Sequence, residues 1–137
     1  MAQILAVDYG TRRLGVAVSD PEGRFALPLE TLELPARSRP AAVARLAEER
    51  GAVTVVVGRP VRSAGEDSGL WPEIEKFALR LRARGLNVVF EDEAFTSAEA
   101  ADLLGRRRPS TRGKGAVDAL AASLILKQYL DRLAREA

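Results

Sequence analysis

Five short apolar segments, three of them crowded into the first 34 residues, constrain this chain more than any other feature of its sequence. They lie at residues 3–9, 15–20, 25–34, 52–58 and 87–93. Only turns separate the first three segments, so we expect these to pair as antiparallel strands. Each of the last two follows a helical pattern, which indicates a crossover connection and a parallel strand. Pro28, within the third segment, predicts an edge strand or a bulge.

Helical patterns complete the expected architecture. They span residues 40–50, 72–84, 97–104 and about 116–133. We therefore predict an α/β fold, with a mixed five-stranded sheet in which the first three strands are antiparallel and strands 1, 4 and 5 are parallel. Helices are expected on both faces of this sheet. A chain of 137 residues has the size of one domain, so we assign residues 1–137 to a single domain.

The sequence contains neither cysteine nor histidine. This excludes disulfides, thiolate and imidazole catalysis, and the usual zinc sites. The formal net charge is only +2, so the chain as a whole is not a polycation. No apolar stretch approaches the roughly 20 residues that cross a bilayer, and the N-terminus shows no secretory pattern. We therefore expect a cytoplasmic protein that does not act at a membrane.

Carboxylates fall at places that this fold brings together. Asp8 ends the first strand, Glu91–Glu93 end the fifth, and Asp118 is predicted in the first turn of the last helix. In a sheet with parallel crossovers, ligand sites form at the carboxyl edge of the strands. Asp118 shares its helix face with Ala121 and Ala122, which predicts that this face packs against the sheet.

Three acids that converge without histidine predict a site for a hard divalent cation, Mg²⁺ or Mn²⁺. Such sites hydrolyse phosphodiester bonds. Each acid also has a simpler interpretation. Asp8 can start a turn, Glu91–Glu93 can be a solvated strand end, and Asp118 can complement the helix dipole. Glu91 and Asp92 are alternatives to Glu93 as the middle ligand.

Basic residues concentrate in the stretch "RRRPSTRGK", residues 106–114. Arginine suits phosphate recognition, although a solvated loop would have the same composition. The cations predicted to hold backbone phosphates are Arg12, Arg59, Arg62, Arg106, Arg107, Arg108, Arg112 and Lys114. Arg59 and Arg62 adjoin a Gly- and Ser-containing loop at residues 61–70, which we expect to lie over the substrate, although a plain flexible connection is an alternative.

Four motifs in order, "DYGTRRLGVAVSD", "VVVGRP", "EDEAFTSAEA" and "KGAVDALAA", resemble those of the YqgF family. This family is also called RuvX, or the Holliday-junction resolvase and pre-16S ribosomal RNA nuclease family. The resemblance runs from Ile4 to about Tyr129 and implies an RNase H-like fold and a metal-dependent nuclease. By motif position, it implies that Asp8, Glu93 and Asp118 are the acidic site residues. Lys114 matches the lysine that precedes the last aspartate.

The sequence departs from the family pattern at two positions. Ala94 stands where the family usually has an arginine, and Arg59 stands where it usually has a leucine before a proline. If the missing arginine contacts substrate or pairs with an acid, this chain must do so differently.

Two other classes of function remain open from the sequence. The motif around Asp8 also resembles the first phosphate loop of actin-like ATPases, although this chain supplies only one lobe and lacks a second glycine-rich phosphate loop. The chain could also bind nucleic acid or assist ribosome assembly without turnover. For the nuclease, the expected substrate is structured nucleic acid, either the 5′ end of pre-16S rRNA or a four-way DNA junction. Cutting a junction symmetrically would require a homodimer.

Overall fold

A computed structural model of the chain describes residues 2–59, 70–92 and 113–136, with side chains in the last stretch from residue 118 onward. Among the described residues, four elements precede the α1 helix and four follow it. Before it come strands β1 (Ile4–Tyr9), β2 (Leu14–Ser19) and β3 (Ala26–Leu32) and a short 3-10 helix, η1 (Ala36–Ser38). Helix α1 (Arg39–Arg50) is followed by β4 (Thr54–Arg59), α2 (Trp71–Ala83), β5 (Asn87–Asp92) and α4 (Gly113–Glu136).

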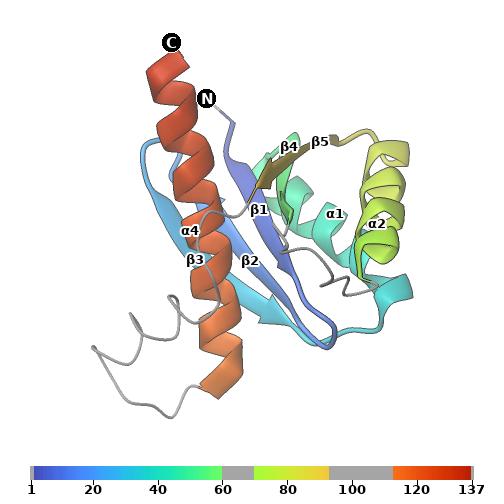
Figure 1. The fold of residues 1–137 in the computed structure, drawn as a ribbon. Helices are drawn as coiled ribbons and strands as arrows, with labels where there is room; N and C mark the ends of the chain where they lie inside the picture. Colours follow the sequence, from blue (N-terminus) through green and yellow to red (C-terminus); the bar gives the residue numbers. More distant parts are fainter. Residues whose placement is uncertain (1, 60–69, 93–112, 137) are drawn as a thin grey trace.

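The five strands form one sheet in the order β3-β2-β1-β4-β5. Strand β2 pairs antiparallel with both β1 and β3, whereas β1 pairs parallel with β4, and β4 with β5. Helix α4 crosses one face of the sheet, and α1 and α2 cover the other (Figure 1). The predicted mixed sheet, with its strand directions and helices on both faces, is confirmed.

Alternation along β1 divides its side chains between two cores. Leu5, Val7 and Tyr9 belong to the core on the side of α1 and α2. Ala6 belongs to the core beneath α4, together with Ala122 of that helix. Because side chains of a strand alternate between faces, Asp8 lies on the same face as Ala6, toward α4. The carboxylate at the end of β1 therefore faces the long C-terminal helix.

Strand β3 lies at the edge of the sheet, as Pro28 predicted. Its register with β2 shifts, so that Val16 pairs with Glu30 and Ala17 pairs with Pro28. The residue between them, Leu29, is the extra residue of a bulge. Proline lacks an N–H group and is accommodated at such an edge or bulge, which confirms the prediction.

The last helix is longer than predicted. It spans Gly113–Glu136 rather than about 116–133, because Gly113 and Gly115 do not stop it. Ion pairs at i,i+4 spacing, Lys127 with Asp131 and Arg132 with Glu136, support its C-terminal half. The prediction that Asp118 lies in the first turn was therefore wrong, since it lies in the second turn.

Other predicted boundaries shift by one or two residues. Helices α1 and α2 each begin one residue earlier than predicted, at Arg39 and Trp71. The Ser38 side chain makes no cap hydrogen bond to α1. The helix predicted at 97–104 lies outside the described residues. Among the described helices, none has the length and apolarity that a membrane span requires.

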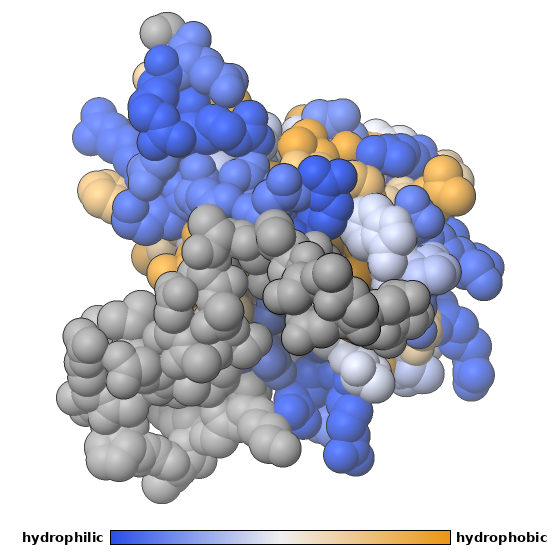
Figure 2. Space-filling view, in the orientation of Figure 1, coloured by the Kyte–Doolittle hydropathy of each residue, from blue (hydrophilic) through white to orange (hydrophobic). Residues whose placement is uncertain are grey.

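A buried carboxylate connects β5 to α4. Glu91 is only 5% exposed and accepts a hydrogen bond from Gln128 Nε2 at 2.8 Å. Arg132 donates to the other Glu91 oxygen through Nε and Nη2. Hydrophilic side chains cover the outer side of this part of α4 (Figure 2). The helix is thus held to the sheet by an apolar core and by one buried ionic cluster.

We predict that Arg132→Ala lowers the free energy of unfolding by about 1–3 kcal/mol, because it removes the cation that pairs with the buried Glu91 carboxylate. Lys127→Ala is the matched control, since it breaks an exposed ion pair on the same helix and should cost under about 0.5 kcal/mol. Urea denaturation measures both. Equal losses for the two variants would contradict a stabilising role for the buried cluster.

Candidate active site

Two of the predicted acids, Asp8 and Asp118, are neighbours of the same glycine, Gly15. Asp8 pairs in register with Gly15 on the neighbouring strand β2. Gly15 in turn lies directly against the backbone of Asp118 in α4. A Cβ built on Gly15 would clash with the Asp118 carbonyl oxygen and would lie 3.0 Å from Ala119 N. The absence of a side chain at Gly15 is what allows the two acid-bearing segments to approach.

Small residues extend this close approach along the helix. Ala6 and Ala17, on β1 and β2, are fully buried against Ala122 and Ile125 of α4. The predicted packing face of α4, with alanines three and four positions after Asp118, is thereby confirmed. The helix can lie low on the sheet and bring Asp118 down to the level of Asp8.

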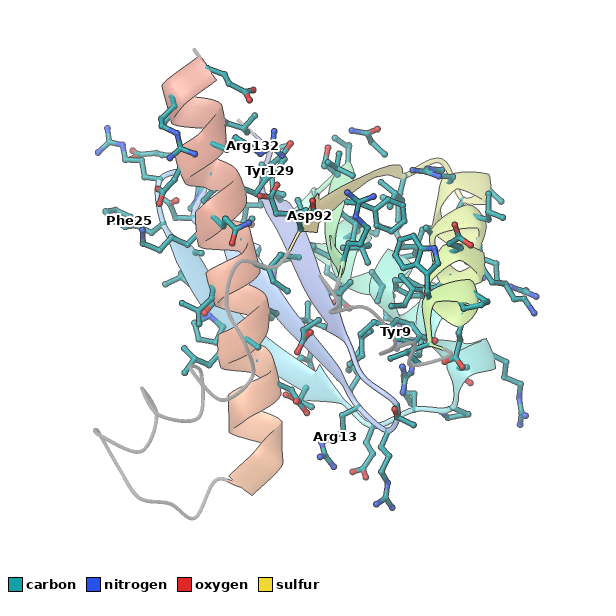
Figure 3. The ribbon with its side chains drawn as sticks, viewed as in Figure 1. Tyr9, Arg13, Phe25, Asp92, Tyr129 and Arg132 are labelled. Atoms are coloured by element: carbon teal, nitrogen blue, oxygen red, sulfur yellow. The ribbon has the colours of Figure 1, made fainter. Side chains whose placement is uncertain are left out.

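Asp118 pairs with an arginine from the β1–β2 hairpin. Arg13 Nε donates to Asp118 Oδ2 at 2.9 Å, and both side chains are about one quarter exposed. Figure 3 shows Arg13 at the hairpin end of the sheet, near the N-terminal half of α4. The guanidinium neutralises one carboxylate oxygen and fixes the orientation of Asp118.

Arg12 was predicted to be a site residue from the sequence, whereas Arg13 was not. Arg12 is exposed, whereas Arg13 stands two residues before Gly15. Arg13 directly precedes β2, and extending the alternation of the strand by one residue puts it on the same face as Gly15, so this spacing was a usable signal for Arg13. We call Asp8, Asp118 and the Gly15 between their segments the acid site. Arg13 is a cation of this site that was not predicted from the sequence.

Of the three candidates for the middle acid, the structure describes Glu91 and Asp92. Glu93 lies outside the described residues, as does Ala94. The two alternatives to Glu93 both have side-chain partners. Glu91 accepts hydrogen bonds from Gln128 and Arg132 of α4, and Asp92 pairs with Arg59. The Arg59 hydrogen bond holds the pKa of the Asp92 carboxyl below its ordinary value.

Most predicted phosphate contacts lie outside the described residues. Arg62, Arg106, Arg107, Arg108 and Arg112 belong to the undescribed segments, and the Lys114 side chain is not described although its backbone begins α4. Arg59 is described and is half exposed, with its Nε directed to Asp92. A phosphate contact by Arg59 would compete with this ion pair.

The donor set fits a hard divalent cation. Asp8 and Asp118 offer carboxylate oxygens, which Mg²⁺ and Mn²⁺ prefer. Within residues 2–59, 70–92 and 118–136, no three acidic side chains gather closely enough to hold a metal ion. The described part therefore contains two of the three predicted ligand residues, Asp8 and Asp118.

Comparison with known proteins gives a family and a fold. The family model "RuvX: Holliday junction resolvase" matches residues 2–132. A Koribacter versatilis protein named "Putative pre-16S rRNA nuclease" is 42% identical over 133 residues, which cover 95% of this chain and 87% of that protein. A Syntrophus aciditrophicus protein with the same name is 37% identical over 137 residues, covering 98% and 91% of the two chains.

Solved structures support the same fold at low sequence identity. Thermus thermophilus RuvC has a TM-score of 0.60 and 17% identity, covering 96% of each chain. The fowlpox virus Holliday junction resolvase has a TM-score of 0.53 and 15% identity, covering 95% of this chain and 99% of its own. The RNase H-like fold that the motifs implied is confirmed.

We predict that Gly15→Ala costs more than about 3 kcal/mol of unfolding free energy, because its Cβ meets backbone atoms that cannot rotate away. Gly85→Ala is the matched control. Gly85 has a φ of 90° and open space around its Cβ, so the substitution adds only backbone strain of about 1–2 kcal/mol. Chemical denaturation compares the two, and an equal or smaller loss at Gly15 would contradict the close approach.

Proposed function

Because the chain belongs to the RuvX family of Holliday junction resolvases, we propose that it is a divalent-metal-dependent endonuclease acting on structured nucleic acid. The observation that carries this proposal is that Asp8 pairs with Gly15 in the sheet while the Asp118 backbone packs directly on Gly15, beneath α4. Packed backbone therefore fixes the two acid-bearing segments beside each other, which favours a preorganised pair of carboxylate ligands.

In this proposal Asp8, Asp118 and Glu93 hold Mg²⁺ or Mn²⁺. When bound, the cation would lower the pKa of a water molecule and stabilise charge on the departing oxygen. The role of the protein is to hold the two acid-bearing segments close together and to orient their side chains. Packing at Gly15 supplies the proximity, and the hydrogen bond from Arg13 orients the Asp118 carboxylate.

Cations of the chain would hold the nucleic acid backbone. We assign this role to Arg12, which is exposed near the acid site, and to Lys114, at the start of the helix that carries Asp118. Arg106, Arg107, Arg108 and Arg112 precede that helix in the sequence and would extend the phosphate contacts, as would Arg59, which ends β4, and Arg62, three positions later in the sequence. Such contacts position a substrate without reading its sequence.

For the substrate we propose the 5′ end of pre-16S rRNA first. Relatives that share 37–42% identity over nearly the whole chain carry the pre-16S rRNA nuclease name. A four-way DNA junction is the second candidate, since the family description and the RuvC-like fold both point to it. Symmetric cutting of a junction would add the requirement of a homodimer.

We predict that Asp8→Asn and Asp118→Asn each lower cleavage roughly 100-fold or more, because each removes a charged metal ligand, while nucleic acid affinity changes only a few-fold. Asp131→Asn, which alters an exposed acid of the same helix, should cleave normally. Single-turnover cleavage and binding assays with Mn²⁺, Mg²⁺ or EDTA give these values.

The same assays run on precursor rRNA and on a synthetic four-way junction separate the two substrates. Cleavage of precursor rRNA at its 5′ end, abolished by EDTA, is the expected result. A native protein that binds both substrates but cuts neither in Mn²⁺ would overturn the nuclease and favour a binding or assembly factor.

A further inference from the structure

A buried arginine lies on the opposite side of the sheet from the acid site. Arg39, the first residue of α1, is only 1% exposed. Among the described residues it is the largest fully buried side chain. Removing a guanidinium from water costs several kcal/mol unless its hydrogen bonds are replaced. Any movement that breaks the hydrogen bonds of the buried Arg39 guanidinium is therefore costly, so the groups that accept these bonds are held in place.

The Arg39 guanidinium binds backbone carbonyls from two separate segments. Nη1 donates to Gly10 O at 2.7 Å and Nη2 donates to Thr11 O at 3.2 Å. Nε donates to Leu34 O at 3.0 Å, in the segment between β3 and η1. A planar fork of donors suits this arrangement, and a lysine could not make all three bonds from one fixed plane.

A tyrosine and a glutamate complete the surroundings of this cation. The Arg39 guanidinium carbon lies 4.6 Å from the centre of the Tyr9 ring. The Tyr9 hydroxyl donates to Glu73 Oε2 at 2.6 Å, at the start of α2. Burial, and then the Glu73 hydrogen bond, raise the pKa of Tyr9 to about 12, so the hydroxyl keeps its proton at neutral pH. Figure 3 shows Tyr9 on the α2 side of the sheet.

The two hairpin carbonyls that Arg39 holds lie between the acid site's own residues. Gly10 and Thr11 separate Asp8, on β1, from Arg13, which pairs with Asp118. Gly10 N–H also donates to Arg13 O at 2.9 Å, and a Cβ on Gly10 would lie only 2.7 Å from that oxygen. This turn is tight, so a displacement of its carbonyls moves Arg13 as well.

We propose that Arg39 is a positioning residue for the acid site. From the far face of the sheet it fixes the Gly10–Thr11 turn, and the turn sets Asp8 and Arg13 relative to Asp118. This inference rests on the proposed function, since the acids that it positions are the proposed metal ligands. On this proposal, the buried Arg39 serves mainly to fix the geometry of the acid site, and only secondarily to stabilise the fold.

The test compares Arg39→Met and Arg39→Lys with Val43→Ala in the full-length protein. Val43 is fully buried in the same core, one turn further along α1, so its truncation destabilises the fold through packing alone. Two quantities are measured for each variant, at temperatures chosen so that all variants have the same free energy of unfolding. They are the exchange rate of the Gly10 amide by NMR and the affinity for Mn²⁺ by calorimetry.

We expect Arg39→Met to speed Gly10 exchange at least about 10-fold more than Val43→Ala does and to weaken Mn²⁺ binding about 10- to 100-fold, with Arg39→Lys in between. Changes no larger than those of Val43→Ala would overturn the proposal and leave Arg39 a structural residue. Asp8→Asn should weaken Mn²⁺ binding without altering Gly10 exchange.

The two readouts keep this inference separate from the proposed function. If the native protein binds no Mn²⁺, the proposed metal site fails, and positioning of metal ligands by Arg39 fails with it. Normal Mn²⁺ binding by the native protein, together with undiminished binding by Arg39→Met, overturns the positioning role alone.

Discussion

The contact between Gly15 and the backbone of Asp118 is the constraint on which the candidate site depends. A helix normally stands off a sheet by the length of the side chains between them. Here a glycine on β2 and alanines along β1, β2 and α4 remove that spacing. The consequence is chemical as well as structural, because the residue brought down onto the sheet is an aspartate and the strand beside it carries another.

The hairpin between β1 and β2 links the two faces of the sheet. On the α4 side it carries Asp8, and its far end supplies Arg13 to Asp118. On the other side its carbonyls bind Arg39, which lies over Tyr9. Alternation along β1 assigns neighbouring residues to these two tasks, since Asp8 faces one core and Tyr9 the other. Strand β1 therefore carries Asp8 on the face of the proposed metal site and Tyr9, which contacts Arg39, on the opposite face.

The sequence predicted the architecture well because its signals were local. The apolar segments, the turn between Asp8 and Gly15, and Pro28 at an edge each depend on a few neighbouring residues. The face of α4 was predictable from the alanines that follow Asp118. The length of α4 was not, because glycines near its start resemble stops and tertiary packing overrides such local preferences.

Long-range partners escaped the sequence. Arg13 meets Asp118 across 105 positions, and Arg39 meets Gly10 across 29, and neither pairing leaves a periodic pattern. Motif order predicted Asp8, Glu93 and Asp118 as site residues. The structure places Asp8 and the Asp118 backbone beside Gly15, which was not singled out from the sequence, and Glu93 lies outside the described residues.

A crystal structure of the native protein with Mn²⁺, phased on the manganese anomalous signal, would show whether Asp8 and Asp118 bind one metal site. We expect an anomalous peak with oxygens of both Asp8 and Asp118 at bonding distance, roughly 2.0–2.3 Å. Manganese bound elsewhere, with Asp118 still held by Arg13 and no peak beside Asp8, would contradict it.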